Sequence, residues 1–259
     1  MRLSMYLASV YTQSSSQRGF TLVELMISMT IGLFLSAGMV ALLIGNKQSY
    51  RDSENVARVQ ETGRFAVEYL AKNVRQSGLQ NFAGIPPANW PPTNYIQGWP
   101  GATSAPSGAI LTVGVSGYVK NTDLFRITYY DTNLSSVVTY TYYVSNTSGL
   151  PGLREQKTVV NTTTTTNEEL LESVYDMQLR YGVDTTGDDQ IDNYFNTAPD
   201  WNRVLAVKID LLVGSSEDNL VDAAMSLPFE KNDGTFFTAT NRRIYQMFST
   251  TVALRNRMK

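Results

Sequence analysis

One apolar segment near the N-terminus, Phe20–Ile44, constrains what this chain can fold into more than any other feature. It contains no Lys or Arg, and its single acidic residue is Glu24. A helix of this length reaches ~37 Å at ~1.5 Å per residue, which exceeds the ~30 Å hydrocarbon core of a bilayer. The sequence therefore predicts a membrane-spanning helix behind a short basic leader.

The leader, Met1–Gly19, differs from an ordinary secretory signal, which carries its cleavage site after the apolar region. Here the expected cut lies before that region. The run Gly19-Phe20-Thr21-Leu22-Val23-Glu24 resembles the processing site of type IV prepilins and type II secretion pseudopilins. The resemblance implies that a prepilin peptidase cuts between Gly19 and Phe20 and that Phe20 is then N-methylated. A plain single-pass anchor is the alternative.

Composition excludes several classes of function. The chain of 259 residues contains no Cys and no His, so disulfides, thiolate zinc sites, Cys nucleophiles and Ser-His-Asp triads are all ruled out. We therefore expect no enzyme. Without Arg2 and Arg18 of the leader, the 21 basic residues become 19, which against 23 acidic residues leaves a net charge of −4. That balance favours no nucleic-acid partner.

The leader also predicts orientation. Arg2 and Arg18 precede the span, and the positive-inside rule keeps them in the cytoplasm. Lys47 and Arg51 lie just past the span and weaken this charge bias, so we base the predicted orientation on the prepilin-like leader. We expect a single-pass protein of the inner membrane whose C-terminal domain lies in the periplasm and later in the pilus at the cell surface.

Beyond Ile44 the helix should continue with an amphipathic pattern. Apolar or small residues recur at steps of three and four, which is the helical period; they are Val56, Val59, Gly63, Ala66, Val67, Leu70 and Val74. Gly78 is a natural helix end. We predict one helix from Phe20 to Ser77. The expected organisation is a leader at 1–19, a pilin helix at 20–78 with its membrane and assembly segment at 20–44, and a globular β-rich domain at 79–259.

The rest of the chain is typical of β-structure. A proline-rich stretch, 83–108, is predicted to be a long loop whose Trp90, Tyr95 and Trp99 either bind a partner or anchor the loop. Asn161–Asn167, with its consecutive threonines, is predicted to be a second loop. Strands rich in Val, Ile, Leu and Tyr are predicted, in antiparallel order because short turns separate them; they are Ala109–Val115, Asp123–Asp131, Val137–Val144, Leu153–Val160, Leu170–Val183, Arg203–Val213 and Arg243–Leu254. The predicted fold class is α+β, a long N-terminal helix packed on an antiparallel sheet.

Further segments carry a closer resemblance. They are Gln76-Ser77-Gly78, Tyr181-Gly182-Val183-Asp184, the strand that starts at Trp201-Asn202-Arg203, and the tail from Arg242 to Arg257. Together they resemble the PilW-type minor pilins of type IV pili. The resemblance implies a subunit that joins other minor pilins, primes pilus assembly at or near the tip, and supports twitching motility and adhesion. Its partners would be minor and major pilins, the prepilin peptidase and the inner-membrane assembly platform. A type II secretion pseudopilin and a pilus-displayed adhesin are the alternatives.

Glu24 becomes the fifth residue of the predicted mature chain. An acid inside a membrane segment is costly and is usually functional. The family resemblance implies that Glu24 pairs with the free amine of Phe20 on a neighbouring subunit and so sets the axial register. The alternative is an acid that only interacts with the dipole of the helix N-terminus.

An Asp-rich segment, 184–192, resembles a calcium-binding loop. Hard oxygen ligands at alternating positions suit Ca²⁺, and Asp184, Thr186 and Asp188 occupy such positions, with Asp192 as a later ligand. Asp189 stands where the usual glycine would be, and Phe195 stands where a bidentate acid belongs. A solvated turn is the alternative. No other cofactor is expected.

Overall fold

We describe the fold from a computed structural model, which places residues 19–80, 94–109, 111, 117–146, 149–160, 162 and 164–256. The leader up to Arg18, the part of the proline-rich stretch that holds Trp90, and most of Ala109–Val115 lie outside these residues. The chain divides into two compact units, Met1–Tyr50 and Arg51–Lys259. The boundary falls within the single long helix, so its amphipathic part belongs to the second unit.

The helix, α1, covers Leu22–Gln76, which confirms the predicted helix to within two residues at each end. It ends as predicted at Gly78, whose φ of 77° is the left-handed conformation that glycine adopts without strain. The amide of Ser77 donates to the carbonyl of Val74 over 3.0 Å, and that of Leu79 to the carbonyl of Gln76 over 2.9 Å. These bonds satisfy carbonyls that the helix end would otherwise leave unpaired.

Up to Ile44 the helical part of the first unit is largely apolar all around, with Glu24 as its charged residue. Every residue from Gly19 to Tyr50 is exposed, and by length and composition α1 contains a stretch able to cross a membrane. Three hydroxyls in this stretch bond back to carbonyls four residues earlier: Ser28 to Glu24 (2.8 Å), Thr30 to Met26 (2.6 Å) and Ser36 to Gly32 (2.7 Å). They therefore need no partner outside the helix.

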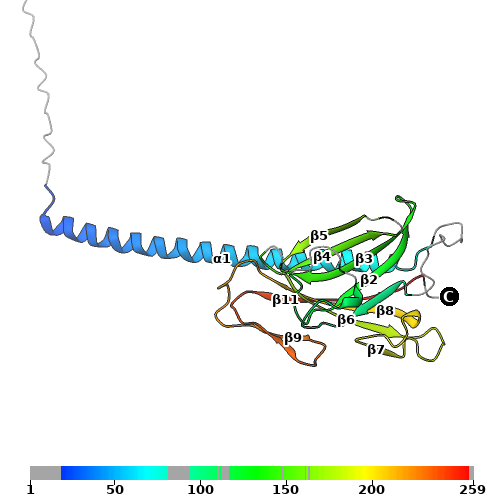
Figure 1. The fold of residues 1–259 in the computed structure, drawn as a ribbon. Coiled ribbons are helices and arrows are strands. Elements are labelled where there is room, and N and C mark those ends of the chain that lie inside the picture. Colours follow the sequence, from blue (N-terminus) through cyan, green and yellow to red (C-terminus); the bar gives the residue numbers. More distant parts are fainter. Residues whose placement is uncertain are drawn as a thin grey trace, which may run out of the picture. The chain divides into compact units, whose positions relative to one another are not determined.

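The second unit contains two antiparallel sheets and a hairpin (Figure 1). In one sheet the order is β1 (Ile96–Trp99), β2 (Leu124–Asp131), β3 (Ser136–Ser145), β4 (Gly152–Val159) and β5 (Thr165–Glu172). In the other it is β11 (Tyr245–Ala253), β8 (Val204–Gly214), β6 (Val174–Val183) and β7 (Asn193–Phe195). The hairpin pairs β9 (Ser226–Glu230) with β10 (Phe236–Thr238), and two short 3₁₀ turns, η1 (Ser107–Ala109) and η2 (Trp201–Arg203), complete the described elements.

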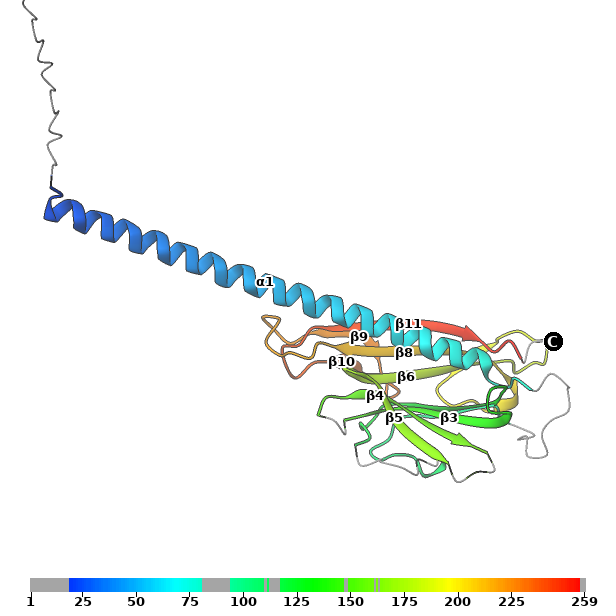
Figure 2. The same ribbon diagram turned by 90° about the horizontal axis from the view of Figure 1, so that it is seen from above.

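The amphipathic part of α1 packs on this β-structure, as the sequence predicts. Figure 2 shows it running alongside β11. Val59, Ala66, Leu70 and Val74 are buried in one core with inward-facing side chains of both sheets. Val56, which the predicted stripe includes, is exposed instead. At Gly63 a side chain would meet the ring of Phe248 on β11, because an added Cβ would lie 2.1 Å from Cε2. The glycine thus allows the helix to approach the sheet closely.

Several expectations for the β-region need correction. The expected single sheet is two sheets, because the predicted strand Leu170–Val183 breaks at Ser173, whose φ is 65°. The predicted loop at 83–108 contains the edge strand β1, since a strand of 4 residues between prolines can still pair along one side. Thr165, Thr166 and Asn167 lie in β5 rather than in a loop, in keeping with the strand preference of β-branched residues.

Trp99 shows what the aromatic residues of the proline-rich stretch do where they are described. It packs against a small buried cluster of Ala109, Leu124 and Tyr143. The guanidinium of Arg126 lies over its ring, 5.1 Å from the centroid. This side chain therefore anchors its segment to the sheet.

Candidate functional site

The predicted processing site, Gly19-Phe20, lies just before α1. Phe20 is 82% exposed. The hydroxyl of Thr21 accepts a hydrogen bond from the amide of Glu24 over 3.2 Å, and the carbonyl of Thr21 accepts one from Leu25 over 3.1 Å. Thr21 is therefore the N-cap, and Thr21-x-x-Glu24 has the pattern of a capping box. Sequence reasoning missed this cap, although its signal was present.

Glu24 lies in the first helical turn, where a negative charge interacts favourably with the helix dipole. The carboxylate forms no ion pair with any residue that the structure describes. This placement agrees both with pairing to a neighbouring subunit and with an interaction of Glu24 with the helix dipole alone. Its pairing with a neighbouring subunit stays a prediction.

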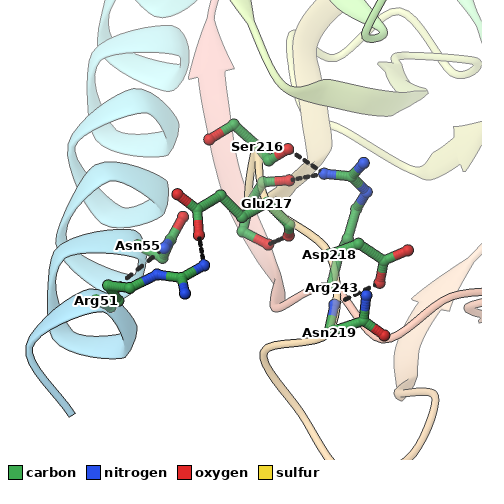
Figure 3. Close-up of polar contacts among 8 residues, drawn as sticks. Arg51, Asn55, Ser216, Glu217, Asp218, Asn219 and Arg243 are labelled. Carbon is green, nitrogen blue, oxygen red and sulfur yellow. Dashed lines mark hydrogen bonds and ion pairs between the residues drawn. The ribbon is translucent and has the colours of Figure 1, made fainter. Parts of the chain in front are cut away.

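A polar junction holds the loop after β8 against the first helical turn of the second unit (Figure 3). A guanidinium nitrogen of Arg51 lies 2.6 Å from a carboxylate oxygen of Glu217, and the hydrogen bond from Arg51 holds the pKa of Glu217 below its usual range. Arg243 donates from the other side to the carbonyls of Ser215 (3.0 Å) and Ser216. The ion pair is exposed, so it contributes more to the placement of the loop than to stability.

This junction could not be found from the sequence, because Arg51 and Glu217 are 166 residues apart. The junction fixes the position of the loop after β8 relative to α1. The loop at 215–217 contacts α1 where the second unit begins, and β11 starts beside it. The opposite end of β11 also reaches α1, because the side chain of Asn256 donates to the carbonyls of Arg75 (3.3 Å) and Ser77 (3.0 Å).

The Asp-rich loop is a hydrogen-bonded turn in this structure. Asp184 accepts bonds from the amides of Gly187 and Asp189, and Asp192 accepts bonds from the hydroxyl and amide of Thr185 and the amide of Thr186. These bonds lower the pKa of both carboxyls, with Gly187 the main cause for Asp184 and the Thr185 hydroxyl for Asp192. Asp188 accepts a bond from the amide of Gln190 over 3.0 Å.

The proposed calcium ligands form hydrogen bonds within their own loop. Across the described residues, no three acidic side chains are grouped so as to hold a metal ion. Asp184 and Asp192 already accept several amide and hydroxyl donors each. The arrangement therefore has the hydrogen bonding of a solvated turn, and calcium binding stays a prediction that needs its own test.

The calcium hypothesis predicts that millimolar Ca²⁺ raises the melting temperature of the full chain in detergent, because the ion binds the folded state only. The increase should disappear in Asp184→Ala/Asp188→Ala and persist in Asp222→Ala, which changes an exposed acid outside the loop. Differential scanning fluorimetry measures it. An unchanged melting temperature of the parent chain would remove the hypothesis.

Comparisons with known proteins found two family models and a solved structure that are similar to parts of this chain. The family model of the type IV pilus-assembly protein W (PilW) matches residues 141–256, and that of the prokaryotic N-terminal methylation motif matches residues 14–40. Among solved structures, the type IV-like pilin TTHA1219 from Thermus thermophilus is similar, with a TM-score of 0.49 and 13% identity over 78% of this chain and 99% of that chain. No curated protein matches. The two family matches therefore cover the segment around Gly19-Phe20 and the C-terminal region, where this chain is similar to proteins with the N-terminal methylation motif and to PilW.

Proposed function

We propose that this chain is a minor pilin that co-assembles with other minor pilins to prime type IV pilus assembly at or near the tip. The observation that carries this proposal is a prepilin-type site, Gly19-Phe20, joined directly to an exposed apolar helix in a chain whose C-terminal region matches PilW. In this proposal the protein is structural rather than catalytic, and it supports twitching motility and adhesion through the pilus.

The proposed route has three steps. The prepilin peptidase removes Met1–Gly19 and Phe20 is N-methylated. The segment 20–44 then holds the subunit in the inner membrane, with its C-terminal domain in the periplasm. The inner-membrane assembly platform finally moves the subunit into a complex with other minor pilins, on which the major pilin is added.

Processing is tested first by mass spectrometry of the intact protein and its N-terminal peptide, after purification from membranes that contain an active prepilin peptidase. The proposal predicts a chain that starts at N-methylated Phe20. A chain that keeps Met1–Gly19 would contradict the proposed function, because an unprocessed subunit would be only a single-pass anchored domain.

Glu24 is proposed to act at the assembly step. A carboxylate and an ammonium attract each other much more strongly in a dry helix bundle than in water, provided that their geometry is good. The partner in our proposal is the α-amine of Phe20 on a neighbouring subunit. Glu24 forms no ion pair with a described residue, which is compatible with a partner on another subunit.

Replacing Glu24 with valine should leave membrane insertion intact and decrease incorporation into pili by ~100-fold or more, because an unpaired buried charge costs about 3–5 kcal/mol. Immunoblots of membrane and sheared-pilus fractions measure the two quantities. Glu54→Val is the matched control, since Glu54 lies on the same helix outside the apolar segment and is exposed. Normal incorporation of Glu24→Val would contradict the proposed role of this residue.

A further inference from the structure

The strand β11 is the edge strand of its sheet, and α1 borders a groove beside it. It is 9 residues long and pairs with β8 in continuous register along its whole length. Its sequence contains no charged residue and no proline, and no strand lies on its other side in the described part of the chain. Natural proteins usually protect such an edge with charges, prolines or bulges, because a regular edge pairs readily with another strand.

The outward-facing backbone groups of β11 can be assigned from the bonds at its two ends. Ser215 donates to the carbonyl of Ile244, and Leu254 donates to that of Leu205. Because bonding alternates along an antiparallel pair, the residues between them that bond to β8 are the even-numbered ones. The amides and carbonyls of Ser249, Thr251 and Ala253 therefore point away from β8, and all three residues are exposed.

Positive charge lies beside this edge. A groove between α1 and β11 is lined by Arg64 and Arg75, together with Glu68, Phe248, Ser249 and Thr250. Neither arginine forms an ion pair with a residue that the structure describes. An acidic strand that paired with β11 would place its carboxylates near these guanidinium groups.

The other sheet ends in an acidic edge strand of this kind. The strand β5 is the outer strand next to β4, and it contains Glu168, Glu169 and Glu172. Glu169 is paired with Arg154 over 3.1 Å. Glu168 and Glu172 form no ion pair within the described residues. The edges β11 and β5 are therefore complementary in charge.

The two edges also run in opposite directions along α1. β11 starts beside the Arg51 end of α1 and finishes at Asn256, which bonds to Arg75 and Ser77. β5 starts at Thr165, which lies in one cross-strand row with Thr128 of β2. The carbonyl of Thr128 accepts a hydrogen bond from the amide of Gly78, so this row lies at the C-terminal end of α1. It finishes at Glu172, which lines a groove with Arg58 and Thr62 of α1.

We propose that β11 of one copy of this chain pairs, antiparallel, with β5 of a second copy. Where the α1 segments from Arg51 on point the same way in two copies, β11 of one copy and β5 of the other are antiparallel. Pairing of β11 with another β11 would instead bring the arginines beside the two edges, Arg64 and Arg75 of each copy, close to one another, so charge favours β5 as the partner. The contact is head-to-tail, so it leaves β5 of the first copy and β11 of the second copy open for further subunits. That α1 points the same way in both copies rests on the proposed function.

Engineered cysteines test the contact directly, since the chain has no Cys of its own. Full-length chains with Ser249→Cys and chains with Asn167→Cys, differing in an epitope tag, are co-expressed, and membranes are treated with a mild oxidant. A disulfide-linked dimer that carries both tags is expected. Replacing either partner with Thr132→Cys, in the exposed turn between β2 and β3, should abolish it.

Register distinguishes a specific pairing from chance collisions. In an antiparallel pair, moving the first cysteine two residues forward moves its partner two residues back. Chains with Ser249→Cys or Thr251→Cys are each tested against Thr165→Cys, Asn167→Cys and Glu169→Cys. The preferred partner of Thr251→Cys should lie two residues before that of Ser249→Cys. Equal yields for all pairs, or a partner that moves forward, would overturn the proposal.

Charge exchange provides an independent test. Arg64→Glu/Arg75→Glu should decrease the yield of the best cysteine pair at least several-fold, and Glu168→Arg/Glu172→Arg on the partner should restore it. Dimers formed by Ser249→Cys alone would show β11–β11 pairing and overturn the proposal. The absence of any mixed dimer in a chain shown by mass spectrometry to be processed at Gly19 would overturn this inference while leaving the proposed function standing.

Discussion

Replacing Gly63 with leucine should lower the free energy of unfolding by about 2–3 kcal/mol, because extra atoms in a well-packed core force side chains and backbone apart. An added Cβ would already lie 2.1 Å from Cε2 of Phe248 and 2.3 Å from its Cδ2. Leucine adds further atoms in the same direction, so α1 must move away from β11 or the ring must leave its position. Denaturant unfolding of the full chain in detergent measures the loss.

The matched control is Gly38→Leu, the same change in the same helix at a position where an added Cβ meets no atom within 4 Å. It should leave the unfolding of the second unit unchanged. The double variant Gly63→Ala/Phe248→Ala should be less destabilised than the two single changes predict together, because removing the ring removes the clash. Simple additivity in that cycle would show that the contact with Phe248 does not explain the effect.

Stability should also fall as the pH rises from 5 to 7, and Asp123 is the main reason. This carboxyl is 1% exposed, between the two sheets. It accepts hydrogen bonds from the amides of Leu179 (2.7 Å) and Gly101 (2.7 Å) and from the side chain of Asn232. These donors lower its pKa, but burial outweighs them, and nearby Asp176 adds repulsion, so the pKa rises to about 7.

The direction of the effect follows from proton linkage. Between the ordinary aspartate pKa and 7, the folded state keeps a proton that the unfolded state has lost, so a rise in pH favours unfolding. Burial also raises the pKa of Asp176, to about 6, which acts in the same direction. Asp123 alone should lower the free energy of unfolding by ~2 kcal/mol from pH 5 to pH 7, since one proton contributes about 1.4 kcal/mol per pH unit, and Asp176 should add to this decrease.

Denaturant titrations of the full chain at several pH values measure this slope. Asp123→Asn cannot ionise and should flatten it, while lowering stability at every pH because an amide nitrogen then faces buried donors. Asp222→Asn, at an exposed site, should keep the parent slope. A parent chain whose stability is constant from pH 5 to 7 would contradict the raised pKa of Asp123.

Features with a local cause could be predicted from the sequence. The helix and its end at Gly78 follow from hydrophobic periodicity and from the backbone freedom of glycine. Most strands follow from β-branched and aromatic runs: β2, β3, β8 and β11 differ from the predicted spans by two residues or fewer at each end. The processing motif is local as well, which is why it could be recognised without a structure.

Features that depend on distant residues could not be predicted. The break at Ser173 needs a left-handed backbone at a residue that is not glycine, and the sequence carries no strong signal for that conformation. The role of Gly63 depends on Phe248, and that of Asp123 on Leu179 and Asn232, which come from other strands and loops. The Asp-rich loop shows that one spacing of acids can suit two structures, and its calcium binding stays a prediction. A spacing of acids that suits a metal in sequence also suits a turn whose own amides satisfy the carboxylates.

The back-bonded hydroxyls of Ser28, Thr30 and Ser36 have a consequence for how this helix changes surroundings. Each already has its acceptor within the same helix, so moving from lipid into a bundle of helices breaks none of these bonds. On the proposed assembly route, the apolar segment can therefore move from lipid into the helix bundle without the free-energy cost of breaking these hydrogen bonds. The balance between staying and leaving then depends on side-chain packing and on the single carboxylate at Glu24.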